Sequence, residues 1–309
     1  MRKWIAVFVI LLLVLLCAYW LIPGKTNVHQ KTIVPVNTRA FAREILDEQK
    51  WQQWWPGKQT RSSSFKFKEN TYRLEEKKLS SLMITINNGT DSLSTELIFV
   101  PLQADSIELS WNGIKNSNTN PLHRLQNLSW TKNLDADINL LLQKIRSFYS
   151  NEDNLYGFHI EKALVADSNL ISTSTTTRAY PTTEVIYALV DKLRNYIQKN
   201  EAKELGYPML NIYKNPDSFY LVRVAIPTDK KLNNSGDIQY RWMLQGGNIL
   251  VTEVKGGQQQ IERAFIKMEN YVEDHRRIAP AIPFQSLVTD RRQEPDTNKW
   301  ITKVYWPVM

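Results

Sequence analysis

The sequence predicts an α+β protein, and three observations lead to this fold class. A β-branched and aromatic stretch that ends in proline occurs twice, at residues 221–228 and 299–308. Residues 82–111 alternate between apolar and polar side chains, as antiparallel strands do. A long apolar stretch, residues 4–22, lies close to Met1. The expected order is therefore a transmembrane helix within 1–25, an antiparallel sheet domain at 26–150, a linker at 151–156 and a duplicated β-α-β-β domain at 157–309.

The apolar stretch 4–22 is long enough to be a membrane anchor. At about 1.5 Å per residue, a helix over these residues covers a hydrocarbon core of about 30 Å. The basic residues Arg2 and Lys3 precede it. A removed signal peptide, which is the alternative, has a shorter apolar region and a small-x-small cleavage site. The sequence therefore predicts a single-pass membrane protein with the lipid bilayer as a partner, and it leaves open which side of the membrane the other residues face.

Composition narrows the range of partners and cofactors. The net charge is +8, but the basic residues are spread along the chain and mixed with acidic ones. This distribution is more typical of a solvated basic surface than of a nucleic-acid interface. The single cysteine, Cys17, excludes a disulfide within the chain, and the four histidines have no spacing typical of a zinc or haem site. We therefore expect no metal, no cofactor and no nucleic-acid partner.

Short helices and a series of strands are expected in residues 26–150. Asn37 is expected to cap a helix with Phe41 and Ile45 on one face. A closing helix is expected from Asp135, because apolar residues recur at helical spacing up to Tyr149. The strands are expected at 31–36, 82–86, 93–100 and 106–111, with a hairpin turn at 87–90.

A tryptophan-rich segment follows the first expected helix. Val36-Asn37 and Ala42 precede Trp51-x2-Trp54-Trp55-Pro56, and this opening resembles that of the START-like, Bet v 1-like superfamily (SRPBCC). The resemblance implies a helix-grip sheet over residues 26–150 with a cavity for an apolar ligand, or a collapsed version without one. The tryptophans themselves are interpreted as core residues, because aromatic side chains dominate core burial.

The two proline-terminated strands belong to a longer repeat. Aligning them places Arg223 against Lys303 and Val224 against Val304. A helix with the same apolar spacing precedes each copy, beginning its stripe at Ile186 and at Ile261. A strand-like segment, 169–174 or 248–254, comes before each helix. Residues 157–309 are therefore predicted to use one β-α-β-β unit twice.

This repeat, with Lys255-Gly-Gly257 before the second helix and 300–308 at the end, resembles the GyrI-like effector-binding domain of multidrug-sensing transcription activators. The resemblance implies an aromatic-walled pocket for a small molecule between the two repeats. The family pattern commonly has glutamate where Lys303 stands here. If Lys303 and Arg223 both face the pocket, an anionic or neutral ligand is expected rather than a cation. The alternative is that both side chains extend to a solvated edge.

The preferred function is a membrane-anchored, non-catalytic protein that binds an unknown hydrophobic or amphiphilic small molecule. Two alternatives stay open: a hydrolase that uses Tyr305 with Glu253 or Glu269, and a structural module without a ligand. The sequence contains no Gly-x-Ser-x-Gly nucleophile motif and no complete phosphate loop. The expected ligand-binding residues are Lys303, Tyr305, Arg223, Trp242, Tyr213 and Glu253.

Overall fold

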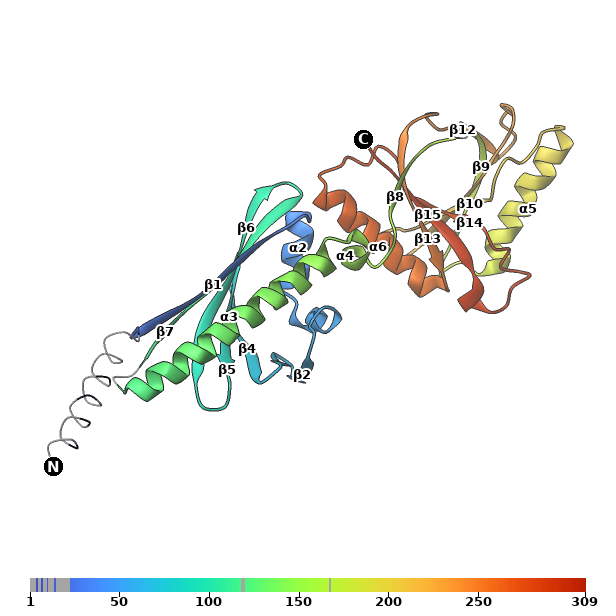
Figure 1. Cartoon of the computed structure of the whole chain (residues 1–309). Helices are drawn as coiled ribbons and strands as arrows, with labels where there is room; N and C mark the ends of the chain where they lie inside the picture. Colours follow the sequence, from blue (N-terminus) through green and yellow to red (C-terminus); the bar gives the residue numbers. More distant parts are fainter. Residues whose placement is uncertain are drawn as a thin grey trace. The chain divides into compact units, whose positions relative to one another are not determined.

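The computed structural model describes residues 23–117, 120–166 and 168–309, together with Trp4, Val7, Ile10 and Val14 (Figure 1). The chain divides into two compact units, and the boundary falls between Leu155 and Tyr156. Each unit combines helices with one antiparallel sheet, so the predicted α+β class is confirmed. The two parts are called the N-terminal unit and the C-terminal unit below.

The predicted single-pass membrane localisation is contradicted. Over the residues that the structure describes, no helix is both long enough and apolar enough to cross a membrane. The longest described helix, α3 (Pro121–Tyr149), carries charged residues along its length and is apolar on one stripe only. Apart from four residues, the stretch 4–22, on which the predicted anchor and bilayer partner depend, lies outside the described residues.

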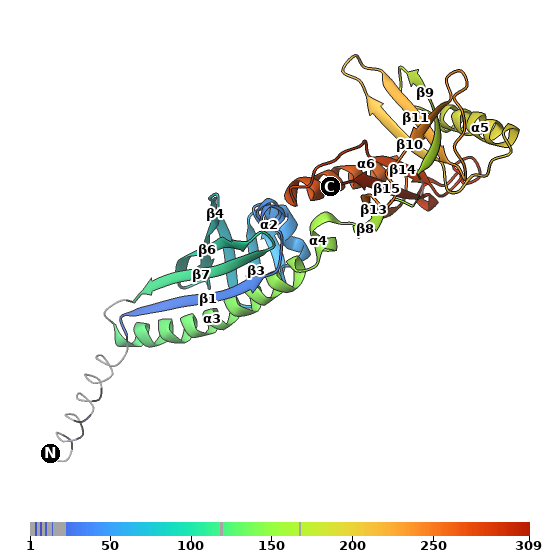
Figure 2. The ribbon, with the colours of Figure 1, turned by 90° about the horizontal axis from the view of Figure 1, so that it is seen from above.

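The N-terminal unit is a seven-stranded antiparallel sheet with one long helix. The strand order is β1-β7-β6-β5-β4-β3-β2. Helix α3 packs along β1 and β7 (Figure 2). Two short helices, α2 (Thr38–Ile45) and η1 (Glu48–Gln53), follow the first strand. The strands are β1 (Lys25–Val34), β2 (Lys58–Arg61), β3 (Ser64–Phe67), β4 (Asn70–Lys77), β5 (Ser81–Asn87), β6 (Ser92–Gln103) and β7 (Ser106–Asn116).

Several boundaries in this unit differ from the predicted ones. The side chain of Asn37 accepts hydrogen bonds from the amides of Arg39 and Ala40, so the expected cap of α2 is confirmed. Helix α3 begins far before Asp135, because Asn120 caps it through the Leu122 amide. The first strand also begins early, at Lys25, and the polar strands β2, β3 and β4 were not predicted.

Aromatic rings form the core of the N-terminal unit. Trp51, Trp54 and Trp55 are all buried, which confirms their interpretation as core residues. The ring of Trp51 lies 6.0 Å from Trp55, and that of Trp55 lies 5.1 Å from Tyr72. Trp111 continues the series at 6.1 Å from Tyr72 and donates to Thr95 Oγ1 at 2.9 Å. The assignment to the START-like superfamily stays a prediction.

The C-terminal unit is built on an eight-stranded antiparallel sheet. Its strand order is β12-β9-β11-β10-β14-β15-β13-β8. One repeat is β9-α5-β10-β11 and the other is β13-α6-β14-β15, so the predicted double use of a β-α-β-β unit is confirmed. The elements are β8 (Glu161–Leu164), β9 (Asn169–Thr177), α5 (Thr183–Lys199), β10 (Met209–Lys214), β11 (Tyr220–Pro227), β12 (Gln239–Trp242), β13 (Asn248–Lys255), α6 (Gln258–Asp274), β14 (Phe284–Leu287), η2 (Thr297–Lys299) and β15 (Ile301–Pro307).

The strand register reproduces the predicted alignment of the repeats. Val224 lies opposite Leu210 on one side and Thr173 on the other. The aligned residue Val304 lies opposite Gln285 and Thr252 in the same way. Both valines are fully buried. Helix α5 packs on β9 and β11, and α6 packs on β13 and β15, so the two helices cover equivalent strands.

Two short segments precede the long helices and strands of the C-terminal unit. Helix α4 (Glu152–Tyr156) occupies most of the segment 151–156, and its role as a linker stays a prediction. Thr182 is the N-cap of α5, so Pro181 lies just before the helix. The fixed φ angle of the proline suits an extended segment at this place.

The core of the N-terminal unit can be tested on one helix. Leu142 is fully buried on α3, whereas Leu140 on the same helix is 48% exposed. We expect Leu142→Ala to lower the free energy of unfolding by about 2–5 kcal/mol, because it leaves a cavity in the core. Leu140→Ala is the matched control, with an expected loss of about 0.5 kcal/mol or less. Urea denaturation measures both, and equal losses would contradict the assigned packing of α3.

Candidate ligand-binding cleft

Alternating side chains of the C-terminal sheet face opposite sides. On β11, Val222, Val224 and Ile226 are buried in the core that includes α5. The intervening residues Arg223 and Ala225 are partly exposed and therefore project from the other face. On β15 the same alternation buries Thr302 and Val304 and leaves Lys303 and Tyr305 partly exposed. We call the face that carries Arg223, Ala225, Lys303 and Tyr305 the cleft face.

The register defines one continuous row of side chains across the cleft face. Directly opposed residues of antiparallel strands project to the same side of a sheet. Ala225 lies opposite Ser172 and Met209, and Lys303 lies opposite Ser286 and Glu253. From one edge to the other the row reads Gln239, Ser172, Ala225, Met209, Ser286, Lys303 and Glu253.

A neighbouring row differs between the two repeats. In the first repeat Arg223 lies between Ser174 and Asn211, and its Nη1 donates to Asn211 Oδ1 at 3.1 Å. Asn211 in turn donates from Nδ2 to the carbonyl of Pro283 at 2.9 Å, which fixes the orientation of its amide. In the second repeat the same row continues with the aromatic residues Phe284 and Tyr305. Phe284 stacks on Tyr305 there, with ring centroids 5.0 Å apart.

Two adjoining cavities open over these rows. The larger has a volume of about 470 Å³ and lies mainly over the first repeat. The smaller has a volume of about 350 Å³ and lies over the second. Met209, Met243 and Phe284 line both cavities and therefore stand between them. The remaining residues that line the larger cavity include Leu170, Ser172, Ser174, Asn211, Arg223, Ala225, Asp237, Gln239, Arg241, Trp242 and Ile282.

The charges that line the cavities are mostly positive. Arg223 and Arg241 line the larger cavity, and Lys303 lines the smaller one. Arg241 donates to the side-chain amide of Gln239 rather than to a carboxylate. Asp237 is the one carboxylate among the described lining residues, and both of its oxygens accept from Lys192 Nζ at 2.6 Å. Hydrogen bonds from Lys192 and then Thr173 hold the pKa of Asp237 below its ordinary value.

Four of the six expected ligand-binding residues line one of the two cavities, and two line neither. Arg223 and Trp242 line the larger cavity, and Lys303 and Tyr305 line the smaller one. Tyr213 lines neither and is 53% exposed near the end of β10. Glu253 also lines neither; it lies on the cleft face opposite Lys303, outside both cavities.

The hydrolase alternative required a carboxylate beside Tyr305. No carboxylate is among the described residues that line the cavity with Tyr305. Glu269 lies exposed on α6, which packs on β13 and β15 from the face opposite the cleft. Within the described chain, the residues named for that chemistry therefore do not meet around the cavity that Tyr305 lines.

Several residues that line the cleft were not predicted from the sequence. Arg241 and Gln239 belong to β12, a four-residue strand that pairs with β9 at the edge of the sheet. Asn211 contacts Arg223 only because β10 and β11 pair in one register. The alternation of Ser172 and Ser174 with buried residues on β9 was a usable signal for their common face.

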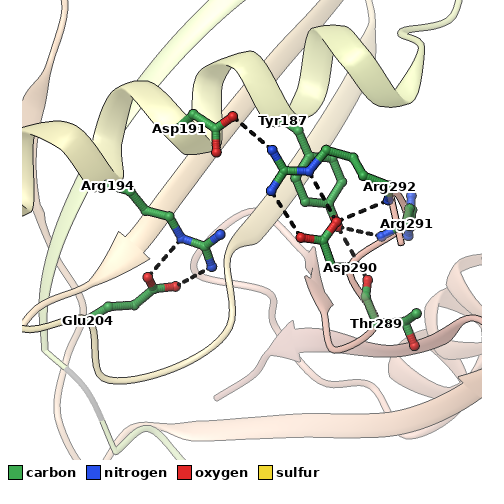
Figure 3. A network of polar contacts seen from close by, with 8 residues as sticks. All are labelled: Tyr187, Asp191, Arg194, Glu204, Thr289, Asp290, Arg291 and Arg292. Carbon is green, nitrogen blue, oxygen red and sulfur yellow. Dashed lines mark hydrogen bonds and ion pairs between the residues drawn. The ribbon is translucent and has the colours of Figure 1, made fainter. Parts of the chain in front are cut away.

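A polar network on the helix-bearing face holds the two repeats together (Figure 3). Arg292 pairs with Asp191 of α5 at 2.8 Å and with Asp290 at 3.0 Å. The Tyr187 hydroxyl accepts from the Arg291 amide at 2.9 Å, so the segment after β14 is fastened to the helix of the other repeat. The Arg291 guanidinium is buried, donates to Gln285 and Thr302, and lies 4.7 Å from the centre of the Trp300 ring. Burial lowers the pKa of this guanidinium.

No family model matches the chain, and no curated protein matches it either. Among solved structures, the EcmrR C-terminal domain is 15% identical, with 49% of this chain and 98% of that chain covered and a TM-score of 0.40. A hydrolase from Listeria innocua is 9% identical, with 48% and 91% covered and a TM-score of 0.37. SAV2435, in a structure bound to tetraphenylphosphonium, is 13% identical, with 49% and 94% covered and a TM-score of 0.31.

The ion pair between Asp237 and Lys192 can be tested by titration. We expect Lys192→Met to raise the pKa of Asp237 toward its ordinary value, because Lys192 is the largest cause of the lowered pKa. Because the folded-state pKa is depressed, the stabilisation from Asp237 is present above the unfolded-state pKa and is lost as the pH falls through the folded-state pKa. NMR titration of the side-chain carboxyl carbon measures the shift. Lys199→Met, on the same helix, is the control, and an unchanged Asp237 pKa in Lys192→Met would contradict the assignment.

Proposed function

We propose that the C-terminal unit is a non-catalytic module of the GyrI-like effector-binding type that binds a hydrophobic or amphiphilic small molecule in its cleft. The observation that carries the proposal is the cavity of about 470 Å³ on the cleft face. Ligand pockets for small molecules generally have volumes of about 300–1,000 Å³. They combine apolar walls with a few polar groups that orient the ligand.

The residues around the cavity match that description. Met209, Phe284 and Ile282 supply flexible thioether, aromatic and aliphatic surface, and Ile282 is 53% exposed. Trp242 is 63% exposed at the rim, so a ligand that covers it removes a large apolar area from water. Burial of apolar surface stabilises a complex by roughly 25 cal/mol per Å² before the costs of association.

We propose a structural role for the N-terminal unit. Its assignment to residues 26–150 and to the helix-grip fold rests on the order of its elements and on the resemblance of residues 36–56. Trp51, Trp55, Phe65 and Tyr72 pack against one another and are all buried. Such an interior supports the collapsed, ligand-free alternative for this unit rather than a second binding cavity.

Ligand binding can be tested with N-phenyl-1-naphthylamine, a neutral apolar dye whose fluorescence rises on leaving water. We expect saturable binding to the full chain. Ala225→Trp is expected to weaken binding about tenfold or more, because the larger side chain fills the centre of the cleft floor and removes contact area for the dye.

The matched control is Ala179→Trp, which adds the same side chain at an exposed position outside both cavities. Thermal unfolding of both variants identifies any general loss of folding. Trp242→Ala, at an exposed rim position, is the second test and is expected to weaken dye binding without lowering the melting temperature. Absence of saturable binding to the wild-type chain would refute the proposed function.

A further inference from the structure

We infer that the cleft selects an anionic amphiphile, with its anionic group bound by Arg223 and Arg241 and its apolar part packed along Met209, Met243 and Phe284. This inference rests on the proposed function, because it names the chemical class of ligand for the same cleft. The ligand class is a carboxylate, sulfonate or phosphate joined to an aromatic or aliphatic body. Its basis is the arrangement of charge and of apolar surface in the two cavities.

The larger cavity is lined by two arginine side chains that form no ion pair among the described residues. Neither Arg223 nor Arg241 is paired with a carboxylate among the described residues; their hydrogen-bond acceptors are the amide oxygens of Asn211 and Gln239. An amide orients a guanidinium but does not neutralise its charge. Both guanidinium groups therefore bring a full positive charge to the same cavity.

The acidic residue on the cavity wall does not cancel these charges. Asp237 accepts from Lys192 with both oxygens and also from Thr173 Oγ1 at 2.8 Å. Lys192 belongs to α5 and does not line the cavity, so it neutralises Asp237 from outside. A cationic ligand would therefore meet two uncompensated guanidinium groups and one carboxylate already in an ion pair.

Arg223 is positioned to bind an anionic group through two parallel hydrogen bonds. A guanidinium has five N–H donors in a rigid fork that matches carboxylate and phosphate oxygens. The Asn211 amide takes one donor at 3.1 Å and is itself held by the Pro283 carbonyl at 2.9 Å. This chain restricts the motion of the guanidinium and lowers the entropy cost of binding an anion.

The smaller cavity is suited to the apolar part of the ligand. Its described lining residues include Ala163, Leu164, Ile249 and Val251, and none of them is a carboxylate. Lys303 is the one cationic residue among these described lining residues, and Glu253 lies opposite Lys303 in the register. Because Met209, Met243 and Phe284 line both cavities, an elongated ligand passes from the arginines to this apolar region across flexible thioether and aromatic surface.

The test compares probes that differ in charge. 8-Anilinonaphthalene-1-sulfonate is N-phenyl-1-naphthylamine with one added sulfonate, so the pair isolates the effect of the anionic group. We expect the wild-type full chain to bind the sulfonate about tenfold or more tightly than the neutral dye, in keeping with charge-assisted hydrogen bonds. Arg223→Gln and Arg241→Gln are each expected to bring the ratio of the two affinities close to one, because charge-assisted hydrogen bonds contribute only when the sulfonate is present.

The matched control is Arg263→Gln, an exposed position on α6, which should leave both affinities unchanged. Added NaCl should weaken the binding of the sulfonate dye and leave the binding of the neutral dye unchanged. If the neutral dye binds but the sulfonate dye binds no more tightly, the anionic ligand class is wrong while the proposed function stands. The same conclusion follows if the cation tetraphenylphosphonium displaces the neutral dye at lower concentration than the sulfonate dye does. If no probe binds, the proposed function itself fails.

Discussion

The pairing of β10 with β14 is the interaction on which the C-terminal unit depends. Met209 lies opposite Ser286 and Leu210 lies opposite Gln285, and these two registered pairs join the repeats into one sheet. Leu210 and Gln285 are buried, whereas Met209 belongs to the cleft face. The cleft exists because this short junction makes the helix-free faces of both repeats continuous. The polar network of Arg292, Asp191 and Asp290 supports the junction from the helix-bearing face.

The repeat was predictable from the sequence because local patterns encode it. Apolar residues at helical spacing from Ile186 and from Ile261, and the aligned Arg223 and Lys303, need no knowledge of long-range pairing. The partners of those residues were not predictable in this way. Asn211 reaches Arg223, and Arg241 reaches the same cavity, only through strand registers that join distant segments.

In the N-terminal unit, the prediction succeeded where residues were strongly apolar and failed where they were polar. Trp51 and its neighbours were placed in the core, because large aromatic side chains have few stable alternatives. Strand β4 and the first half of α3 carry many polar side chains. The hydrophobic pattern that predicts a strand or a helix is therefore weak in both segments. The early start of α3 depends on Asn120 and Pro121, which are capping signals rather than a hydrophobic pattern.

The residues that line the cleft differ between the two repeats. Symmetry places a basic residue at Arg223 and at Lys303, but the residues around them differ. Arg223 is held by Asn211, and β12 adds Arg241 beside it at the edge of the sheet. Around Lys303 the register neighbours are Ser286 and Glu253, and the stacked pair Phe284 and Tyr305 lies beside them with apolar residues of β8 and β13. Donors are concentrated in one repeat and apolar surface in the other, and the orientation that we propose for an anionic amphiphile rests on these sequence differences between the copies.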